Sequence, residues 1–289
     1  MSLSRQTTRL TFIGSGNMAA AIIGGLRALN YPAALIRVCG PDTDQLDELN
    51  SQYGVGISAD NTMFLEDTDL LLLCVKPQIM QAVCTGLAPY LKTKRHLGIL
   101  SIAAGVNTAQ LSTWLDTSLP ILRCMPNTPA MVQEGAAGLF APASASKTLR
   151  DTAETIFGAV GLVAWVEKED DLHAVTALSG SGPAYCFLFL QALESAGIRM
   201  GLSTEVARNL AIQTLRGAGK LAANSTDSPD TLKRKVMSPG GTTEQAIRQF
   251  EADQFVTGVD RAVLKAWERS YTLAGEQCPG PVNLPNAHD

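Results

Sequence analysis

The sequence of 289 residues has only three histidines, and His96, His173 and His288 lie far apart in it. None of them stands at ligand spacing from cysteines or acidic residues, so the pattern predicts no metal site. The six cysteines form no C-x-x-C pair. Most of them lie inside apolar runs, where cysteine behaves as a small hydrophobic residue. This cysteine usage favours a reduced, cytoplasmic protein.

Long apolar runs and clusters of one charge sign are also missing. The longest apolar runs fall well short of the roughly 18–20 residues that a membrane helix needs. Residues 1–8 lack the apolar core of a signal peptide, so we expect none here. The formal net charge is −4, and acidic and basic residues are interspersed. We therefore expect neither a membrane nor a nucleic acid as a partner.

The most informative stretch that is present is Arg9–Ala21, which reads RLTFIGSGNMAAA. A short apolar strand runs directly into Gly-x-Gly-x-x-Ala, and a helix of small residues follows, as in a dinucleotide-binding fingerprint. Gly14 permits the tight turn, Gly16 lets the backbone approach a pyrophosphate, and Ala19 keeps the helix close to the strand. The free N–H groups at the start of that helix favour phosphate binding. Nucleotide binding is therefore the first functional prediction.

The hydrophobic pattern divides the chain near residue 166. Before it, β-like runs alternate with helical patterns, which predicts an α/β fold with a mostly parallel sheet. The expected strands are 10–13, 36–39, 70–75, 98–102, 121–125, 138–140 and 162–166, and the expected helices are 17–29, 43–53, 79–90, 108–115 and 144–160. After it, only helices are expected, at 170–178, 182–196, 203–223, 228–235, 243–250 and 253–274. We predict a Rossmann-like domain over 1–166, an all-α domain over 167–275 and a disordered tail over 276–289.

Polar or small residues follow the carboxyl ends of several predicted strands, where open α/β sheets bind their ligands. Asp42, which follows Gly40, lies about 20 residues past the fingerprint, so it either bonds the ribose hydroxyls or caps the next helix. No arginine follows it to pair with a 2′-phosphate, which favours NADH over NADPH. Lys76 either meets ligand charge or is an ordinary solvated lysine. Asn127 either bonds a carboxamide or serves a stiff turn.

Two segments in the helical half place hydroxyls and glycines before a helix, namely Thr176–Tyr185 and Ser238–Glu244. Free N–H groups and hydroxyls at a helix start favour a carboxylate, and simple capping is the alternative. Residues 184–190, AYCFLFL, are apolar on every helical face, so this helix must be buried all round. It lies either at the centre of a bundle or against a second subunit, and we favour the second subunit.

These motifs resemble those of the pyrroline-5-carboxylate reductases. FIGSGNMA, VKPQ, SIAAG, MPNTP, ALSGSGPAY and SPGGTT occur here in the order in which they occur in that family, between about residues 9 and 274. The resemblance implies hydride transfer from NADPH or NADH to the imine carbon of 1-pyrroline-5-carboxylate, giving L-proline in the last step of proline biosynthesis. It also implies a Rossmann domain followed by a helical domain that forms a homodimer, often within a decamer.

The resemblance also implies roles for single residues. The Thr176 hydroxyl is expected to face the ring nitrogen and to orient it or donate to it. The loop expected to hold the substrate carboxylate consists of Ser238, Gly240, Gly241, Thr242 and Thr243. The residues that the motifs and the resemblance together assign to the cofactor are Gly14, Ser15, Gly16, Asn17, Met18, Gly40, Asp42, Asn61, Val75, Lys76, Pro77, Ala103, Ala104 and Asn127. The end of the second strand lacks the Asn-Arg pair of some members, so the choice between NADPH and NADH stays open.

The predicted chemistry needs no strong acid from the protein, because a cyclic imine is basic enough to carry its own proton near neutrality. Catalysis would then rest on positioning and on oriented dipoles. Two rival functions fit less well. A β-hydroxyacid dehydrogenase needs a catalytic lysine on the helix after the Ser-Gly segment, and residues 182–196 contain none. A protein that only senses NAD(P) has no reason to keep both hydroxyl-rich helix starts.

Overall fold

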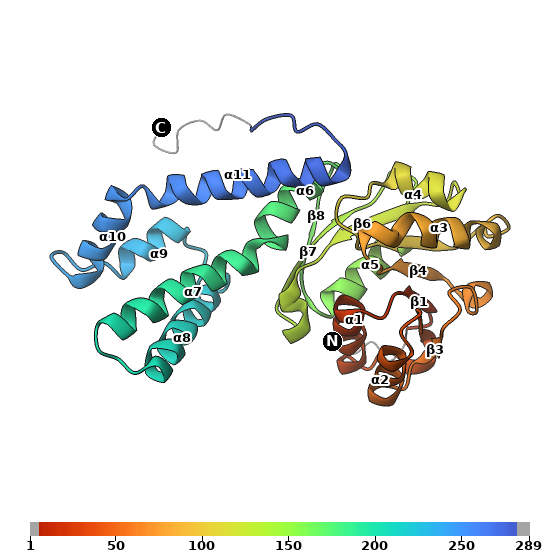
Figure 1. Ribbon diagram of the computed structural model, residues 1–289, viewed down its shortest axis with the longest axis horizontal. Coiled ribbons are helices and arrows are strands. Elements are labelled where there is room, and N and C mark those ends of the chain that lie inside the picture. The colour runs from red at the N-terminus through yellow and green to blue at the C-terminus, as the bar shows by residue number, and fades with distance from the viewer. Residues whose placement is uncertain (1–5, 282–289) are drawn as a thin grey trace. The chain divides into compact units, whose positions relative to one another are not determined.

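The computed structural model describes residues 6–281 and divides the chain into two compact units (Figure 1). The first unit extends to Ser181 and also includes the chain from Ala266 onward, and the second is Gly182–Lys265. The first helix after the sheet, α6 (Asp171–Val175), therefore groups with the sheet rather than with the helical unit.

Within the described residues, the first unit contains an eight-stranded sheet in the order β3-β2-β1-β4-β5-β6-β7-β8. The strands are β1 (Leu10–Ile13), β2 (Ile36–Cys39), β3 (Gly56–Ser58), β4 (Leu70–Leu73), β5 (Gly98–Ser101), β6 (Ile121–Met125), β7 (Gly135–Phe140) and β8 (Gly161–Trp165). Neighbouring strands are parallel except β6 and β7, which are antiparallel. The first six strands follow the order of the Rossmann fold, which confirms the predicted fold class.

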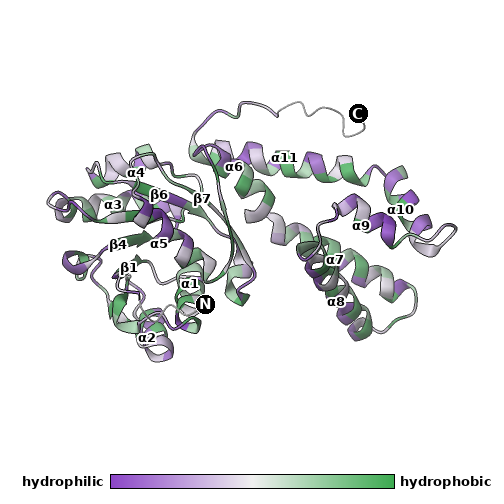
Figure 2. Ribbon diagram, turned by 180° about the vertical axis from the view of Figure 1, so that it is seen from behind, coloured by the Kyte–Doolittle hydropathy of each residue, from purple (hydrophilic) through white to green (hydrophobic). Residues whose placement is uncertain are grey.

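Helices cover both faces of this sheet. One apolar core packs α1 (Asn17–Ala28), α2 (Thr43–Tyr53) and α5 (Lys147–Gly158) against one face, and a second core packs α3 (Pro77–Leu91) and α4 (Thr108–Leu115) against the other. Alternate leucines of β4 enter the two cores, so its uninterrupted apolar run is that of a strand covered on both sides. Figure 2 shows β4 and β1 coloured as hydrophobic.

The expected bounds of β5 and β8 differ by one residue from those of the structure, and three strand predictions need a larger correction. The strand β3 was not expected, because its three residues are too few for a periodic signal. β4 ends at Leu73 instead of residue 75, since the chain turns there toward α3. β7 begins at Gly135 instead of 138, because pairing of Gly135 with Gly161 of β8 decides its start, and Gly-Ala-Ala carries little β propensity.

The second unit is helical, and no strand occurs among the described residues 166–281. Its helices are α7 (Gly182–Arg199), α8 (Thr204–Ala223), α9 (Pro229–Lys235), α10 (Thr242–Ala252) and the first part of α11 (Phe255–Ala274). α7 and α8 pack closely, since a Cβ on Gly197 would lie 3.0 Å from that of Ala207. The expected helix 170–178 is instead split into α6 and the π-helical turn η4 (Thr176–Gly180).

No helix in the described part of the chain is long and apolar enough to cross a membrane. Of the tail predicted to be disordered, residues 282–289 lie outside the described residues. Glu276, which belongs to the same predicted tail, forms side-chain hydrogen bonds to Asn107 and His173.

Candidate active site

The fingerprint turn lies where the strand order reverses, between the carboxyl ends of β1 and β4. Gly14 has a φ of 109°, and a Cβ on it would lie 2.8 Å from the carbonyl oxygen of Cys74. Its N–H donates to the carbonyl of Cys39, at 2.7 Å. Only glycine satisfies both the backbone conformation and the close approach to β4. The predicted role of Gly14 in the turn is therefore supported by the geometry.

The start of α1 fits a pyrophosphate. Gly16 is the N-cap residue, no side chain caps the helix, and a Cβ on Gly16 would meet nothing within 4 Å. Gly16 and Asn17 are exposed, and Met18 is half-buried. The first N–H groups of a helix without a side-chain cap are available to an anion, so these residues suit the phosphates of NADH or NADPH.

At the end of β2, Asp42 caps α2, because its Oδ1 accepts a hydrogen bond from the N–H of Gln45 at 3.1 Å. Ser15 donates through Oγ to the Oε1 of Gln45, at 3.2 Å. A Cβ on Gly40 would lie 3.4 Å from that Ser15 hydroxyl. The capping alternative for Asp42 is thus confirmed, and its contact with a ribose stays a prediction.

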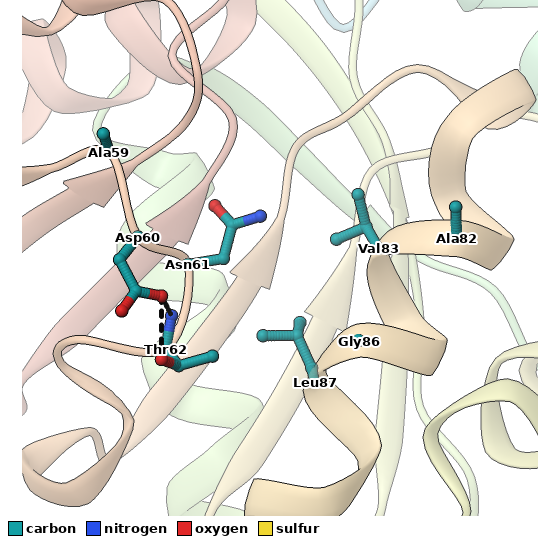
Figure 3. A pocket seen from close by; sticks show the side chains of 8 residues that line it. All are labelled: Ala59, Asp60, Asn61, Thr62, Ala82, Val83, Gly86 and Leu87. Carbon is teal, nitrogen blue, oxygen red and sulfur yellow. Dashed lines mark hydrogen bonds between the residues drawn. The ribbon is translucent and has the colours of Figure 1, made fainter.

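A pocket of about 400 Å³ lies beside this edge of the sheet (Figure 3). The loop after β3 lines one side and α3 lines the other, with Ala59, Asp60, Asn61, Thr62, Ala82, Val83, Gly86 and Leu87. The Oδ1 of Asn61 is buried and has no hydrogen-bond partner within the described structure. Figure 3 shows Asn61 facing Val83 and Leu87 across the pocket. The orphaned oxygen fits the predicted cofactor contact, because a ligand donor would satisfy it.

Sequence reasoning missed the α3 side of this pocket. Ala82 and Gly86 are four residues apart, so these two small residues lie on one face of the helix. That spacing was the available signal. The carboxylate of Asp60 points to Thr62, whose N–H and hydroxyl both donate to it at 2.8 Å. These two hydrogen bonds lower the pKa of Asp60, so it is ionised at neutral pH.

Further along the edge, Lys76 is the exposed N-cap residue of α3, with Pro77 at the first helical position and Val75 before it. The segment after β5 is more buried than the one around Lys76. The hydroxyl of Ser101 accepts the N–H of Ala103 at 3.2 Å, and Ala103 is buried while Ala104 is half-buried. These small residues leave backbone at the ligand-binding edge of the sheet, and the contact of Ala103 and Ala104 with the cofactor stays a prediction.

Asn127 acts as a brace between backbone segments. Its Nδ2 donates to the carbonyl of Ser179 at 3.0 Å, and its Oδ1 accepts the N–H of Ala136 at 2.8 Å. The asparagine thereby ties the loop after β6 to β7 and to η4. A carboxamide held at both ends keeps one N–H and one lone pair, so the predicted cofactor contact is still open to it.

Thr176 begins η4 and is half-buried. Its Oγ1 donates a hydrogen bond to the carbonyl of Leu172, at 2.7 Å. The hydroxyl proton is therefore committed to the helix, and only the oxygen lone pairs remain for a ligand. This position suits a residue that accepts a hydrogen bond from a protonated ring nitrogen, and not one that donates to it.

In the second unit, the loop before α10 already binds a carboxylate. Gly240, with a φ of 72°, donates its N–H to the Oε2 of Glu244 at 2.6 Å. Glu244 also pairs with Arg248, at 2.8 Å. Gly241 is the N-cap residue of α10, and no side chain caps it. This contact is the capping alternative for the segment, and the role of Ser238–Thr243 toward a substrate carboxylate stays a prediction. Glu244, whose role was not predicted, occupies one of the backbone donors of this loop.

A polar cluster also joins residues that are far apart in the sequence. Ligand atoms of Asp170, His173 and Glu276 lie within 4.8 Å of one another. The Nε2 of His173 lies 3.0 Å from Glu276, its Nδ1 lies 2.8 Å from the hydroxyl of Ser270, and the Tyr271 hydroxyl donates to Asp170 at 2.6 Å. These hydrogen bonds account for the cluster without a cation, and the absence of a metal site stays a prediction.

The thiols near the edge of the sheet are poor nucleophiles. All six cysteines are free. Burial raises the pKa of Cys39 to about 12, and burial also raises the pKa of Cys74 and Cys124. Because a thiol reacts as the thiolate, these side chains stay protonated and take no covalent part in the chemistry.

Comparison with known proteins identifies the family. Residues 169–273 match the model described as pyrroline-5-carboxylate reductase dimerisation, and residues 9–105 match the model described as NADP oxidoreductase, coenzyme F420-dependent. The pyrroline-5-carboxylate reductase of Pseudomonas aeruginosa is 46% identical over 268 residues, which are 93% of this chain and 97% of the relative. The chain belongs to the pyrroline-5-carboxylate reductase family.

Other reductases of this family agree. The enzyme of Haemophilus influenzae is 41% identical over 271 residues, covering 91% of this chain and 97% of that one. The structure of the Coxiella burnetii reductase has a TM-score of 0.89 at 40% identity, over 93% of this chain and 99% of that one. The Plasmodium falciparum reductase, solved with NADP bound, has a TM-score of 0.81 at 30% identity, over 93% and 98%. The resemblance found in the motifs is confirmed.

Proposed function

We infer that this protein reduces 1-pyrroline-5-carboxylate to L-proline, the last step of proline biosynthesis, with a hydride from NADPH or NADH. The observation that carries this inference is the membership of the family over nearly the whole chain. The site residues support it, because a fingerprint turn with an uncapped helix start lies at the reversal point of the sheet.

Bound NAD(P)H would supply the hydride, and the protein would supply binding and orientation. The pyrophosphate would lie on the segment from Gly14 to Met18, and the pocket around Asn61 would take part of the nucleotide. The segment Val75–Pro77 and the alanines Ala103 and Ala104 would border the reactive ring, beside Asn127. These assignments follow from the family match and from the position of each residue at the carboxyl edge of the sheet.

On the substrate side, the loop of Ser238, Gly240, Gly241, Thr242 and Thr243 would bind the carboxylate through backbone N–H groups and hydroxyls. Glu244 would have to release Gly240 for this, which its pairing with Arg248 assists. Thr176 would accept a hydrogen bond from the protonated ring nitrogen. That bond favours the iminium form, which is the form that accepts a hydride, and it fixes the orientation of the ring.

Turnover assays test this function. We expect the purified protein to oxidise NADPH or NADH when 1-pyrroline-5-carboxylate is added, and to do so far more slowly with 1-pyrroline, which lacks the carboxylate. Because the two substrates differ only in the carboxylate, the ratio of their rates measures what carboxylate binding contributes beyond the general reactivity of a cyclic imine. Protein that is folded by circular dichroism but turns over neither cofactor would refute the function.

The charge of Asp42 is expected to set the cofactor preference. Asp42→Asn keeps a capping oxygen for α2 but removes the negative charge that would face a 2′-phosphate. We expect it to lower the KM for NADPH by about 3- to 10-fold relative to that for NADH, which corresponds to about 1 kcal/mol at an exposed site. Asp42→Ala serves as the comparison, since it also removes the cap. An unchanged ratio of the two KM values would leave Asp42 as a helix cap only.

The second unit supports a homodimer, and the family resemblance supports the further assembly of dimers into a decamer. α7 leaves large apolar side chains open in the single chain, with Phe187 65% and Leu188 68% exposed. Exposed apolar surface of this kind marks an interface, and the family model that covers this region is a dimerisation domain. A cytoplasmic location is proposed as well, since free cysteines suit a reducing compartment.

Sedimentation analysis checks the interface. We expect no monomer at micromolar concentration for the unaltered protein, and dissociation or aggregation for Phe187→Asp, because a buried charge has no partner there. Tyr90→Asp on α3 is the control, since Tyr90 is 52% exposed outside the proposed interface. A stable, soluble monomer of the unaltered chain would contradict the proposal.

A further inference from the structure

The carboxylate of Glu276, in the segment after α11, contacts two segments of the first unit. One follows the predicted cofactor residues Ala103 and Ala104, and the other precedes Thr176. The Oε1 of Glu276 accepts a hydrogen bond from the Nδ2 of Asn107 at 2.8 Å, and its Oε2 lies 3.0 Å from the Nε2 of His173. Asn107 and His173 are more than sixty positions apart in the chain and lie on different elements, so the two contacts join segments that nothing local connects.

The first contact fixes the end of the predicted cofactor segment. Asn107 is the N-cap residue of α4, in a capping box with Gln110, and it follows Ala103 and Ala104 by only a few residues. Between them, Gly105 has a φ of 69°, and a Cβ on it would lie 3.5 Å from the backbone of Leu273 and Ala274. The segment Ala103–Asn107 therefore rests directly on the end of α11, and Glu276 ties it there.

The second contact fixes the helical turn that leads to Thr176. His173 is 5% exposed and lies three residues before Thr176, on α6. Its Nδ1 lies 2.8 Å from the Ser270 hydroxyl, and its ring stacks on Tyr271 with 3.9 Å between the ring centroids. A buried imidazole held on both nitrogens and on one face has a single orientation, which transmits the position of Glu276 to α6.

A separate brace keeps these elements together without Glu276. Glu169 accepts hydrogen bonds from the N–H and the hydroxyl of Thr108, both at 2.6 Å, and it pairs with the buried Arg123 of β6 at 3.0 Å. The start of α4 is thus anchored to the segment before α6 by another carboxylate. Loss of Glu276 should leave the fold intact and change only the finer alignment.

We propose that Glu276 is a positioning residue for hydride transfer, which fastens the cofactor segment Ala103–Asn107 to the helical turn that carries Thr176. This rests on the proposed function. The hydride donor and acceptor must approach to about 3–3.5 Å, and a displacement of 1 Å costs on the order of 100-fold in rate. A carboxylate that spans the two segments sets that distance without contacting the substrate or the cofactor.

Two pairs of matched proteins test this role. The first pair is Glu276→Ala against Glu276→Gln, since glutamine retains an oxygen for Asn107 and a donor for a neutral His173. The second pair is the chain ended after residue 275 against the chain ended after residue 281, which keeps Glu276. We expect Glu276→Ala and the shorter chain to lose about 10-fold or more in kcat. The glutamine variant and the longer chain should keep most of it.

A readout beyond rate separates positioning from stability. With NAD(P)H deuterated at the transferred position, Glu276→Ala should show a larger isotope effect on kcat, because hydride transfer becomes more rate-limiting, while the KM for the imine and the unfolding temperature stay close to those of the unaltered protein. An unaltered kcat in Glu276→Ala, or a loss that only follows unfolding, would overturn the proposal. An unaltered protein without any turnover would instead refute the proposed function.

Discussion

Thr176→Val is expected to lower kcat/KM for pyrroline-5-carboxylate reduction by about 10- to 150-fold, because the lost hydrogen bond favours the iminium form of the bound substrate, while the KM for NAD(P)H stays nearly unchanged. Valine keeps the shape of threonine but removes the oxygen that would accept a hydrogen bond from the ring nitrogen. One hydrogen bond to a charged group is worth about 1.5–3 kcal/mol, which corresponds to roughly 10- to 150-fold. The hydroxyl proton is committed to Leu172, so the lost interaction is an accepting one.

Two controls sharpen this result. Thr176→Ser restores the oxygen and should recover most of the rate. Thr243→Ala alters the proposed carboxylate loop, whose ligand is charged before and during the reaction, so it should mainly raise the KM for the imine. Steady-state kinetics with both substrates varied measures the split. Full turnover by Thr176→Val would refute a catalytic role for the hydroxyl and leave only its structural hydrogen bond to Leu172.

Gly16→Val is expected to weaken NAD(P)H binding by about 100-fold, or roughly 2.7 kcal/mol. A Cβ at Gly16 would have no contact within 4 Å outside its chain neighbours, so we expect the fold to accept valine, whose side chain would fill the space predicted for the pyrophosphate. Titration of the protein with NADPH and NADH, followed by fluorescence, measures the loss. The unfolding temperature of the variant without cofactor should stay unchanged.

Gly14→Ala is the matched comparison for this experiment. At a φ of 109° and with 2.8 Å to the carbonyl oxygen of Cys74, a Cβ strains the turn itself. This variant should therefore lose stability together with affinity, whereas Gly16→Val should lose affinity alone. Unchanged binding in Gly16→Val would place the phosphates elsewhere.

The nucleotide-binding end of the molecule could be predicted because its signals are local. The strand, the glycine turn and the small-residue helix of residues 9–21 are adjacent in the chain, so the fingerprint is visible in the sequence, although the close approach of Gly14 to Cys74 is a tertiary contact. The uninterrupted leucine run of β4 likewise predicts, from composition alone, that both faces of this strand are buried. Family motifs then extended the same local information to Thr176 and to the loop before α10.

What spacing along the chain could not reveal is which distant groups meet. β3 and the start of β7 exist because a neighbouring strand pairs with them, and their own residues carry little preference for that conformation. The spacing of the small residues Ala82 and Gly86 is visible in the sequence, but their position opposite Asn61 is a tertiary contact. A hydrogen bond needs about 3 Å between two atoms, and sequence distance does not report that.

The clearest case is the C-terminal segment. Its composition of glycine, proline and asparagine predicted disorder, and nothing near Glu276 in the sequence suggests a partner. The sequence by itself determined the Rossmann-like half and the helical half, because propensity and periodicity act over a few residues, and it predicted which residues at the strand ends contact the ligands. Only the tertiary structure decided that Glu276 meets Asn107 and His173, because that contact depends on how α4, α6 and α11 pack.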